Sequence, residues 1–158
     1  MKMAFDRSKL TTVFLFAFCL LLPSIQAKDV KYCGADRKGS YVVKVDGVEI
    51  SPDPVVTGKP ATFNISASTA QPISGGELAI EVSYMGIRVH KETHDLCAGR
   101  PCPISAGKFV LSHTQTLPVF TPPGTYTLKM MMEDEKKRQL TCITFSFSIG
   151  FGSLVSSI

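Results

Sequence analysis

Apolar and polar residues alternate in short runs along most of the chain after residue 40, and Gly or Pro separates one run from the next. Between residues 61 and 67, for example, Phe63 and Ile65 fall on one face of an extended chain and Asn64 falls on the other. A period of two is that of a β-strand with one buried face. The same pattern recurs in residues 78–84, 125–132 and 143–149.

About seven such runs occupy this part of the chain, and helical periodicity is not sustained over more than two turns. We therefore predict an all-β fold, an immunoglobulin-like two-sheet β-sandwich of about seven strands. The chain has no Trp, so it lacks the buried Trp that marks antibody domains.

Two connections have recognisable signals. Asp46-Gly47 separates strand-like residues 41–45 and 48–50, and it predicts either a hairpin turn or a β-bulge. The charged run at residues 133–138 predicts a solvated hairpin tip between the last two strands, which we favour over a docking site.

The first 27 residues read as a secretory signal peptide. Lys2, Arg7 and Lys9 precede an apolar run at residues 13–22, which is too short to span a bilayer as a helix. Ala27 supplies the small residue at the cleavage site, so residues 28–158 are predicted to form the mature domain. The expected location is the secretory pathway, either outside the cell or in a vacuolar or endomembrane lumen.

Four cysteines remain after removal of this leader: Cys33, Cys97, Cys102 and Cys142. An even count in an oxidising compartment implies two disulfides, for which three pairings exist. Cys97 and Cys102 bracket a turn-like segment and would close a small loop, which leaves Cys33 to pair with Cys142.

Charge and motifs exclude several classes of function. Removal of the leader lowers the formal net charge from +4 to about +2, and no basic stripe is left for a nucleic acid. Asn64 opens the one glycosylation sequon of the chain, on the predicted solvent face of its strand. No phosphate-binding loop and no hydrolase motif occurs, so we expect neither an enzyme nor a cofactor.

A metal site is the alternative interpretation of His90 and His94, which precede Cys97 and Cys102. The cysteine spacing is not that of a zinc finger, and an oxidising compartment favours the disulfide. We therefore predict no metal and interpret the two histidines as solvated loop residues. His113 has Ser112 beside it, but neighbours on a strand point to opposite faces, so this pair does not predict a catalytic site.

The inner stripe of the predicted strands contains Met and Phe among Ile and Leu. Met is flexible enough to line a cavity whose occupant varies. By composition alone, however, an ordinary filled core is the better interpretation.

A series of short motifs runs along the chain: VEISPDP at 48–54, GK at 58–59, FNIS at 63–66, YMGIRV at 84–89, DLC at 95–97, CPI at 102–104, LPV at 117–119 and LTC at 140–142. By the order and spacing of these motifs the chain resembles the ML (MD-2-related lipid-recognition) domain family from Tyr32 to Ile149, and this resemblance favours a cavity over a filled core. Within the family it is most similar to the plant and fungal phosphatidylglycerol/phosphatidylinositol transfer proteins, with the Niemann-Pick type C luminal cholesterol carrier as a relative.

The resemblance implies a sandwich that holds a lipid's hydrocarbon between its sheets, and it also implies the pairs Cys33–Cys142 and Cys97–Cys102. The expected function is non-catalytic lipid binding and transfer between membranes, with contact with a membrane surface. The alternative is an interaction module that serves a receptor or regulatory protein partner. The expected lipid-binding residues are Phe63, Ile65, Ile80, Val82, Tyr84, Val89, Pro118, Val119, Met130, Met132, Phe145 and Phe147.

Two departures from the cholesterol carrier bear on the choice of lipid. At its pocket mouth that carrier has aromatic residues where this chain has His90-Lys91 and, further on, Thr121-Pro122-Pro123. Arg88, His90 and Lys91, with His94 nearby, are therefore expected to contact a phosphate headgroup. The predicted ligand is an anionic phospholipid in preference to a sterol.

Overall fold

The structure is a computed structural model and describes residues 27–34 and 40–151. The predicted leader lies outside these residues, apart from Ala27. Seven strands of nine or more residues are present, as predicted, and the described residues contain no helix that could cross a membrane. The strands are β1 (Ala27–Lys28), β2 (Lys31–Tyr32), β3 (Val43–Ser51), β4 (Val55–Val56), β5 (Pro60–Thr69), β6 (Gly76–Tyr84), β7 (Ile87–Asp95), β8 (Gly107–Thr116), β9 (Gly124–Asp134) and β10 (Gln139–Gly150).

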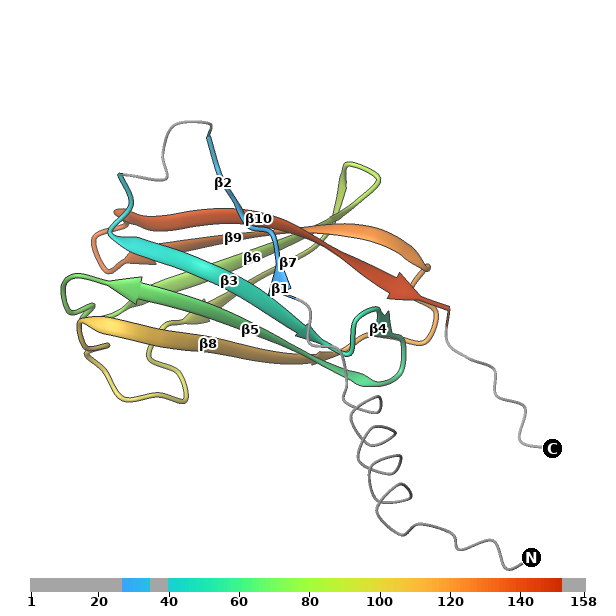
Figure 1. The fold of residues 1–158 in the computed structure, drawn as a ribbon, viewed down its shortest axis with the longest axis horizontal. Coiled ribbons are helices and arrows are strands. Elements are labelled where there is room, and N and C mark those ends of the chain that lie inside the picture. The colour runs from blue at the N-terminus through green and yellow to red at the C-terminus, as the bar shows by residue number, and fades with distance from the viewer. Residues whose placement is uncertain (1–26, 35–39, 152–158) are drawn as a thin grey trace, which may run out of the picture.

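The strands form two sheets that pack face to face, which confirms the predicted sandwich (Figure 1). One sheet has the order β1-β3-β5-β8, and the other has the order β2-β10-β9-β6-β7. All pairings are antiparallel except that of β4, which lies parallel to the end of β10. As a result β7 and β8, which follow each other in the chain, are edge strands of different sheets.

The alternating pattern places the apolar faces between the sheets. On β5, Phe63 and Ile65 are buried, and the ring of Phe63 meets Phe147 of β10 edge to face at 5.4 Å between centroids. Val48 and Ile50 of β3 are also fully buried, as is Ile143 of β10. The core therefore extends across both sheets, as the period-two pattern predicts.

Asp46-Gly47 is a bulge and not a turn. The β3–β5 register shifts between Val45 and Gly47, and β3 continues through both residues. One extra residue on β3 lets the strand bend without ending, which is what a bulge does.

The charged run is a hairpin tip, as predicted, and Asp134 organises it. Its Oδ1 atom accepts hydrogen bonds from the backbone N–H groups of Lys136 and Arg138, each at 2.9 Å. Its Oδ2 atom lies 2.7 Å from Nε of Arg138. These contacts lower the pKa of Asp134, the backbone N–H of Arg138 contributing most.

Both predicted disulfides are present. Cys33–Cys142 joins the segment after β2 to β10 across a separation of 109 residues. Cys97–Cys102 closes a loop in the connection from β7 to β8, where the chain crosses from one sheet to the other.

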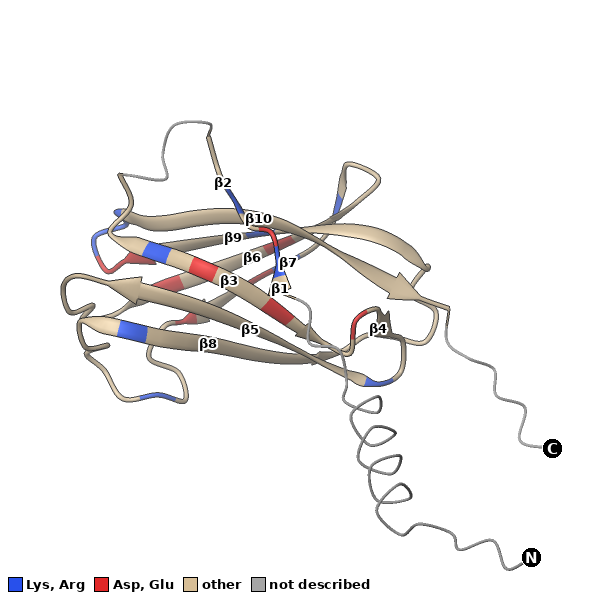
Figure 2. Ribbon diagram, in the orientation of Figure 1, with Lys and Arg blue, Asp and Glu red and all other residues tan. Residues whose placement is uncertain are grey.

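Acidic and basic residues are interspersed along the strands, and β3 carries both signs (Figure 2).

Candidate functional site

A cavity of about 630 Å³ lies between the two sheets. Its wall is built from the inward faces of β5 and β8 in one sheet and of β6, β7, β9 and β10 in the other. Val89 and Phe120 belong to this wall but are 55% and 84% exposed, so the cavity is open to solvent where they lie. This volume falls in the range of small-molecule sites in proteins.

The structure places most of the predicted lipid-binding residues on this wall. They are Phe63, Ile65, Ile80, Val82, Tyr84, Val89, Pro118, Met130, Phe145 and Phe147. They meet there because the inward positions of facing strands come together when the sheets pack.

Met132 and Val119 are not on the wall. Met132 is fully buried in the closed part of the core, since β9 runs past the end of the cavity. Val119 is 77% exposed, and its Cγ1 lies over Gly58, 3.0 Å from where a Cβ would stand. The period-two pattern gives the face of a residue, but it does not show how far along a strand the cavity extends.

An aromatic column lines one end of the cavity. The rings of Tyr84 and Tyr126 stack at 4.6 Å, and Tyr126 stacks on Phe147 at 5.7 Å. The two tyrosine hydroxyls donate to backbone carbonyls of the β8–β9 loop: Tyr84 to Pro123 at 3.3 Å and Tyr126 to Pro122 at 2.8 Å.

The tyrosine hydroxyls are therefore satisfied without a ligand. Burial and the nearby Tyr84 raise the pKa of Tyr126, which keeps its phenol neutral. These rings present aromatic carbon to the cavity and no charge, which suits hydrocarbon.

The headgroup residues predicted on β7 divide between its two faces. His90 is on the cavity wall, but Arg88 and Lys91 are on the outer face of the sheet. Both of these side chains lie 3.4 Å from Oε1 of Glu81. The prediction that all three meet at the opening is therefore wrong.

A bulge in the β6–β7 ladder explains this arrangement. Val82 pairs with His90 and Ser83 pairs with Arg88, so Val89 is the extra residue on β7. An extra residue resets the alternation, and Arg88 and Lys91 thereby reach the same carboxylate.

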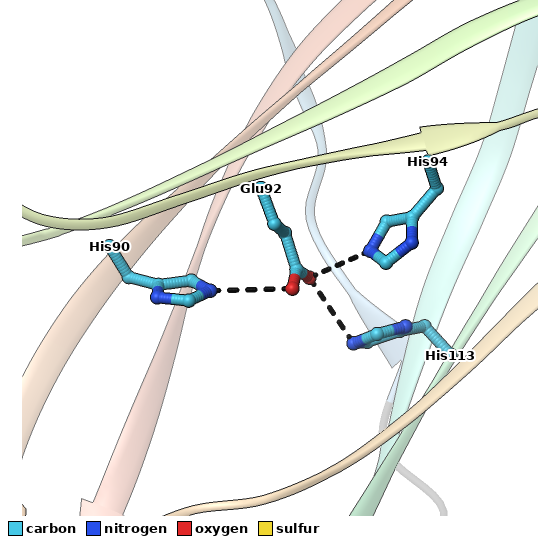
Figure 3. Close-up of polar contacts among 4 residues, drawn as sticks. All are labelled: His90, Glu92, His94 and His113. Carbon is cyan, nitrogen blue, oxygen red and sulfur yellow. Dashed lines mark hydrogen bonds and ion pairs between the residues drawn. The ribbon is translucent and has the colours of Figure 1, made fainter.

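Glu92 and the three histidines form a polar cluster at the cavity wall (Figure 3). His90 and His94 lie on β7 two residues either side of Glu92, so these three side chains share a face. His113 reaches the same carboxylate from β8. The histidines of β7 are thus not loop residues, contrary to the interpretation from sequence.

The geometry of the cluster centres on Glu92. Its Oε1 atom is 3.2 Å from Nε2 of His94 and 3.3 Å from Nε2 of His113, and its Oε2 atom is 3.3 Å from Nε2 of His90. Partial burial opposes ionisation of Glu92, but His94, His90 and His113 together lower its pKa. The carboxylate therefore stays charged at neutral pH.

Sequence reasoning missed Glu92 and His113. The spacing His90, Glu92, His94 is a strand-face signal that can be seen in the sequence. His113 could not have been found in this way, because its position depends on how the two sheets pack.

Phe120 and Arg100 are two further wall residues that were missed. Phe120 immediately precedes Thr121-Pro122-Pro123, so the opening does have an aromatic side chain, contrary to expectation. Arg100 comes from the β7–β8 connection and is the one Lys or Arg on the cavity wall among the described residues.

Asn64 lies on the outer face of β5, as the alternation predicts, and is half-buried. Its Oδ1 atom accepts a 2.7 Å hydrogen bond from Oγ of Ser112. Its glycosylation stays a prediction.

The family model of the ML domain matches residues 27–149. A putative phosphatidylglycerol/phosphatidylinositol transfer protein of Dictyostelium discoideum is 30% identical over 139 residues, which cover 85% of this chain and 94% of the relative. A phosphatidylglycerol/phosphatidylinositol transfer protein of Mycosarcoma maydis is 32% identical over 127 residues, which cover 75% of this chain and 64% of the relative.

Among solved structures, a Niemann-Pick type C2 protein from Japanese carpenter ant superposes with a TM-score of 0.58. The alignment has 17% sequence identity and covers 77% of this chain and 99% of the ant protein. At this identity the match supports the fold and nothing further.

Proposed function

The chain belongs to the ML-domain family, and on that basis we propose that it is a lipid-binding protein without catalytic activity that carries lipid between membranes. The observation that carries the proposal is the open apolar cavity of about 630 Å³ between the sheets. The relatives named as phosphatidylglycerol/phosphatidylinositol transfer proteins support the same function. The two disulfides indicate an extracellular or luminal protein, and we propose that residues 1–27 direct its secretion.

The acyl chains of the lipid are proposed to lie against the inward faces of β5, β6, β9 and β10. Hydrocarbon burial contributes about 0.8 kcal/mol per methylene, so ten buried methylenes would give about 8 kcal/mol before the costs of association. Phe63, Met130 and Phe147 are placed to make these contacts.

We propose that the headgroup is anionic and that Arg100 contacts it. Arg88 and Lys91 are held on the outer face by Glu81, which leaves Arg100 as the permanent cation of the cavity wall in the described residues. A guanidinium can pair with a phosphate through two hydrogen bonds, whereas it gains little from a sterol hydroxyl.

We propose that the protein contacts the membrane with the end of the sandwich where Phe120 lies. The tip of the β6–β7 hairpin exposes Met85 and Ile87, at 83% and 69%. The hydrogen bond from Tyr84 to Pro123 links the end of β6, at the base of this hairpin, to the β8–β9 loop that carries Phe120. Exposed apolar side chains gathered around a cavity opening are suited to entering a bilayer surface.

Loading from mixed vesicles tests the proposal. Delipidated protein is incubated with vesicles of phosphatidylcholine, phosphatidylglycerol, phosphatidylinositol and cholesterol, reisolated, and weighed by native mass spectrometry. One phospholipid per chain, with the two anionic lipids enriched over phosphatidylcholine, is the expected result. Protein that returns without lipid would refute lipid carriage, and selective cholesterol uptake would refute the headgroup assignment alone.

A further inference from the structure

All three histidines of this 158-residue chain converge on the carboxylate of Glu92. Two of them come from β7 and the third from β8, an edge strand of the other sheet (Figure 3). Neutral imidazole together with carboxylate is a common ligand set for zinc-class ions.

The spacing of the donor atoms fits a tetrahedral ion. Metal–ligand bonds of about 2.0–2.1 Å at tetrahedral angles place neighbouring ligand atoms about 3.3 Å apart. Oε1 of Glu92 is 3.2 Å from Nε2 of His94 and 3.3 Å from Nε2 of His113. One possible ligand atom from each of the three residues lies within 4.8 Å of those of the other two, so no pair needs to approach by more than about 1.5 Å to reach that spacing.

His94 supplies a second and independent observation. Its Nε2 atom is buried, although 42% of the side chain is exposed, and it lies 3.2 Å from Oε1 of Glu92 in a geometry that is not that of a hydrogen bond. A buried polar atom that makes no hydrogen bond needs an explanation, and an ion is one of the recognised ones. The lone pair of a neutral imidazole is what a metal ion would occupy.

The remaining contact completes the arrangement found at protein metal sites. Nε2 of His90 lies 3.3 Å from Oε2 of Glu92, the carboxylate oxygen that faces away from the other two histidines. Metal-binding carboxylates are commonly oriented by such a neighbour.

We propose that Glu92, His94 and His113 bind one divalent ion of the zinc class, with His90 orienting the carboxylate and a fourth position left to water. This proposal departs from the expectation from sequence, which rejected a metal because of the cysteine spacing and the oxidising compartment. It joins β7 of one sheet to β8 of the other, and it does not depend on the lipid function. Oxygen-preferring Mg²⁺ and Ca²⁺ are not expected to bind, because two of the three ligands are nitrogen.

Calorimetric titration with ZnCl₂ tests the site in protein that is secreted from the full chain, carries no polyhistidine tag and has been treated with EDTA. The variants are Glu92→Gln, His113→Ala and His90→Gln, and the matched control is Glu49→Gln, a carboxylate-to-amide change at an exposed residue of β3.

We expect one Zn²⁺ per chain in the parent and in Glu49→Gln. His90→Gln should lower the affinity by about 10–100-fold, as loss of an orienting neighbour does. Glu92→Gln and His113→Ala, which remove a ligand, should lower it further. Excess Mg²⁺ should not compete.

Histidine ¹⁵N NMR of the parent decides the question even if a variant fails to fold. Zn²⁺ should shift Nε2 of His94 and His113 strongly and that of His90 weakly. The proposal is overturned if the parent takes up no Zn²⁺, if these resonances do not move, or if folded His113→Ala binds as the parent does.

Discussion

Val82→Trp should block lipid uptake while leaving the protein folded. Val82 lies on the inward face of β6 and on the cavity wall, beside empty volume of about 630 Å³. The indole ring adds about seven non-hydrogen atoms to that space, and we take it to displace about four methylenes of the lipid. At about 0.8 kcal/mol each this removes about 3 kcal/mol of binding, or roughly 100–200-fold in affinity.

Stability separates this cavity from a filled core. An added ring in a close-packed interior costs about 1–3 kcal/mol through strain, whereas an open cavity absorbs it. We therefore expect urea unfolding of lipid-free Val82→Trp to match the parent within about 0.5 kcal/mol.

Val110→Trp is the matched control. Val110 is 54% exposed and pairs with Ser66 on the outer face of the other sheet, so the same ring added there should change neither uptake nor stability. Uptake is measured by vesicle loading and native mass spectrometry. Parent-like uptake by Val82→Trp, or a loss of several kcal/mol in its unfolding, would refute the cavity as the lipid site.

Three more predictions follow from particular contacts. Arg100→Glu should reduce loading of anionic lipid in the vesicle assay, while Lys91→Glu, on the outer face, should change it little; equal effects would contradict the headgroup assignment. Cys33→Ser/Cys142→Ser should lower the free energy of unfolding by about 4–5 kcal/mol, and Cys97→Ser/Cys102→Ser by about 2 kcal/mol, because the first bridge closes the longer loop. The lowered pKa of Asp134 means that its stabilising contribution is present above the ordinary carboxyl pKa and is lost as the pH falls through the lowered value. Asp134→Asn should therefore lower Tm at neutral pH and leave little difference from the parent in the most acidic melts; a constant difference would be evidence against this linkage.

The strands, their inward faces and the disulfides could be predicted from the sequence, because they depend on local alternation and on a small set of cysteines. Phe63, Ile80 and Phe145 could be assigned to the interior on period alone, and the structure has them there. The alternation alone favoured a filled core. Only the resemblance of the ordered short motifs to the ML family led to the prediction of a cavity.

Which side chains of the edge strands face the cavity could not be predicted from the sequence, for physical reasons. One bulge at Val89 decides which residues of β7 face the cavity, and no local signal marks it. The bulge puts Arg88 on the same face as Lys91. His90 and Lys91 were assigned together because His90 was interpreted as a loop residue, whereas neighbours on a strand point to opposite faces. The contact between Glu92 and His113 depends on how the two sheets pack, and the alternation of residues along the chain does not predict that packing.

The two long sides of the sandwich differ in how extensively the two sheets are joined. On the side of β3 and β10, the chain crosses between sheets to pair β4 with β10, and the Cys33–Cys142 bridge fastens the same strand. On the side of β7 and β8, no backbone ladder joins the two sheets among the described strands.

Along the strands themselves, side chains span the space between β7 and β8, and the contact of Glu92 with His113 is one that does so. Beyond the end of β7, the β7–β8 connection crosses between the sheets, and its Ile104 pairs with Ile73 through two backbone hydrogen bonds. Unpaired edges invite association with other chains, and charged residues are a usual protection. Here Lys91 and Glu92 on β7 and Lys108 on β8 supply that protection. The side of β7 and β8 is thus joined less extensively than that of β3 and β10, and the Glu92–His113 contact links the two sheets there. An ion bound at this contact, as proposed above, would hold β7 and β8 together.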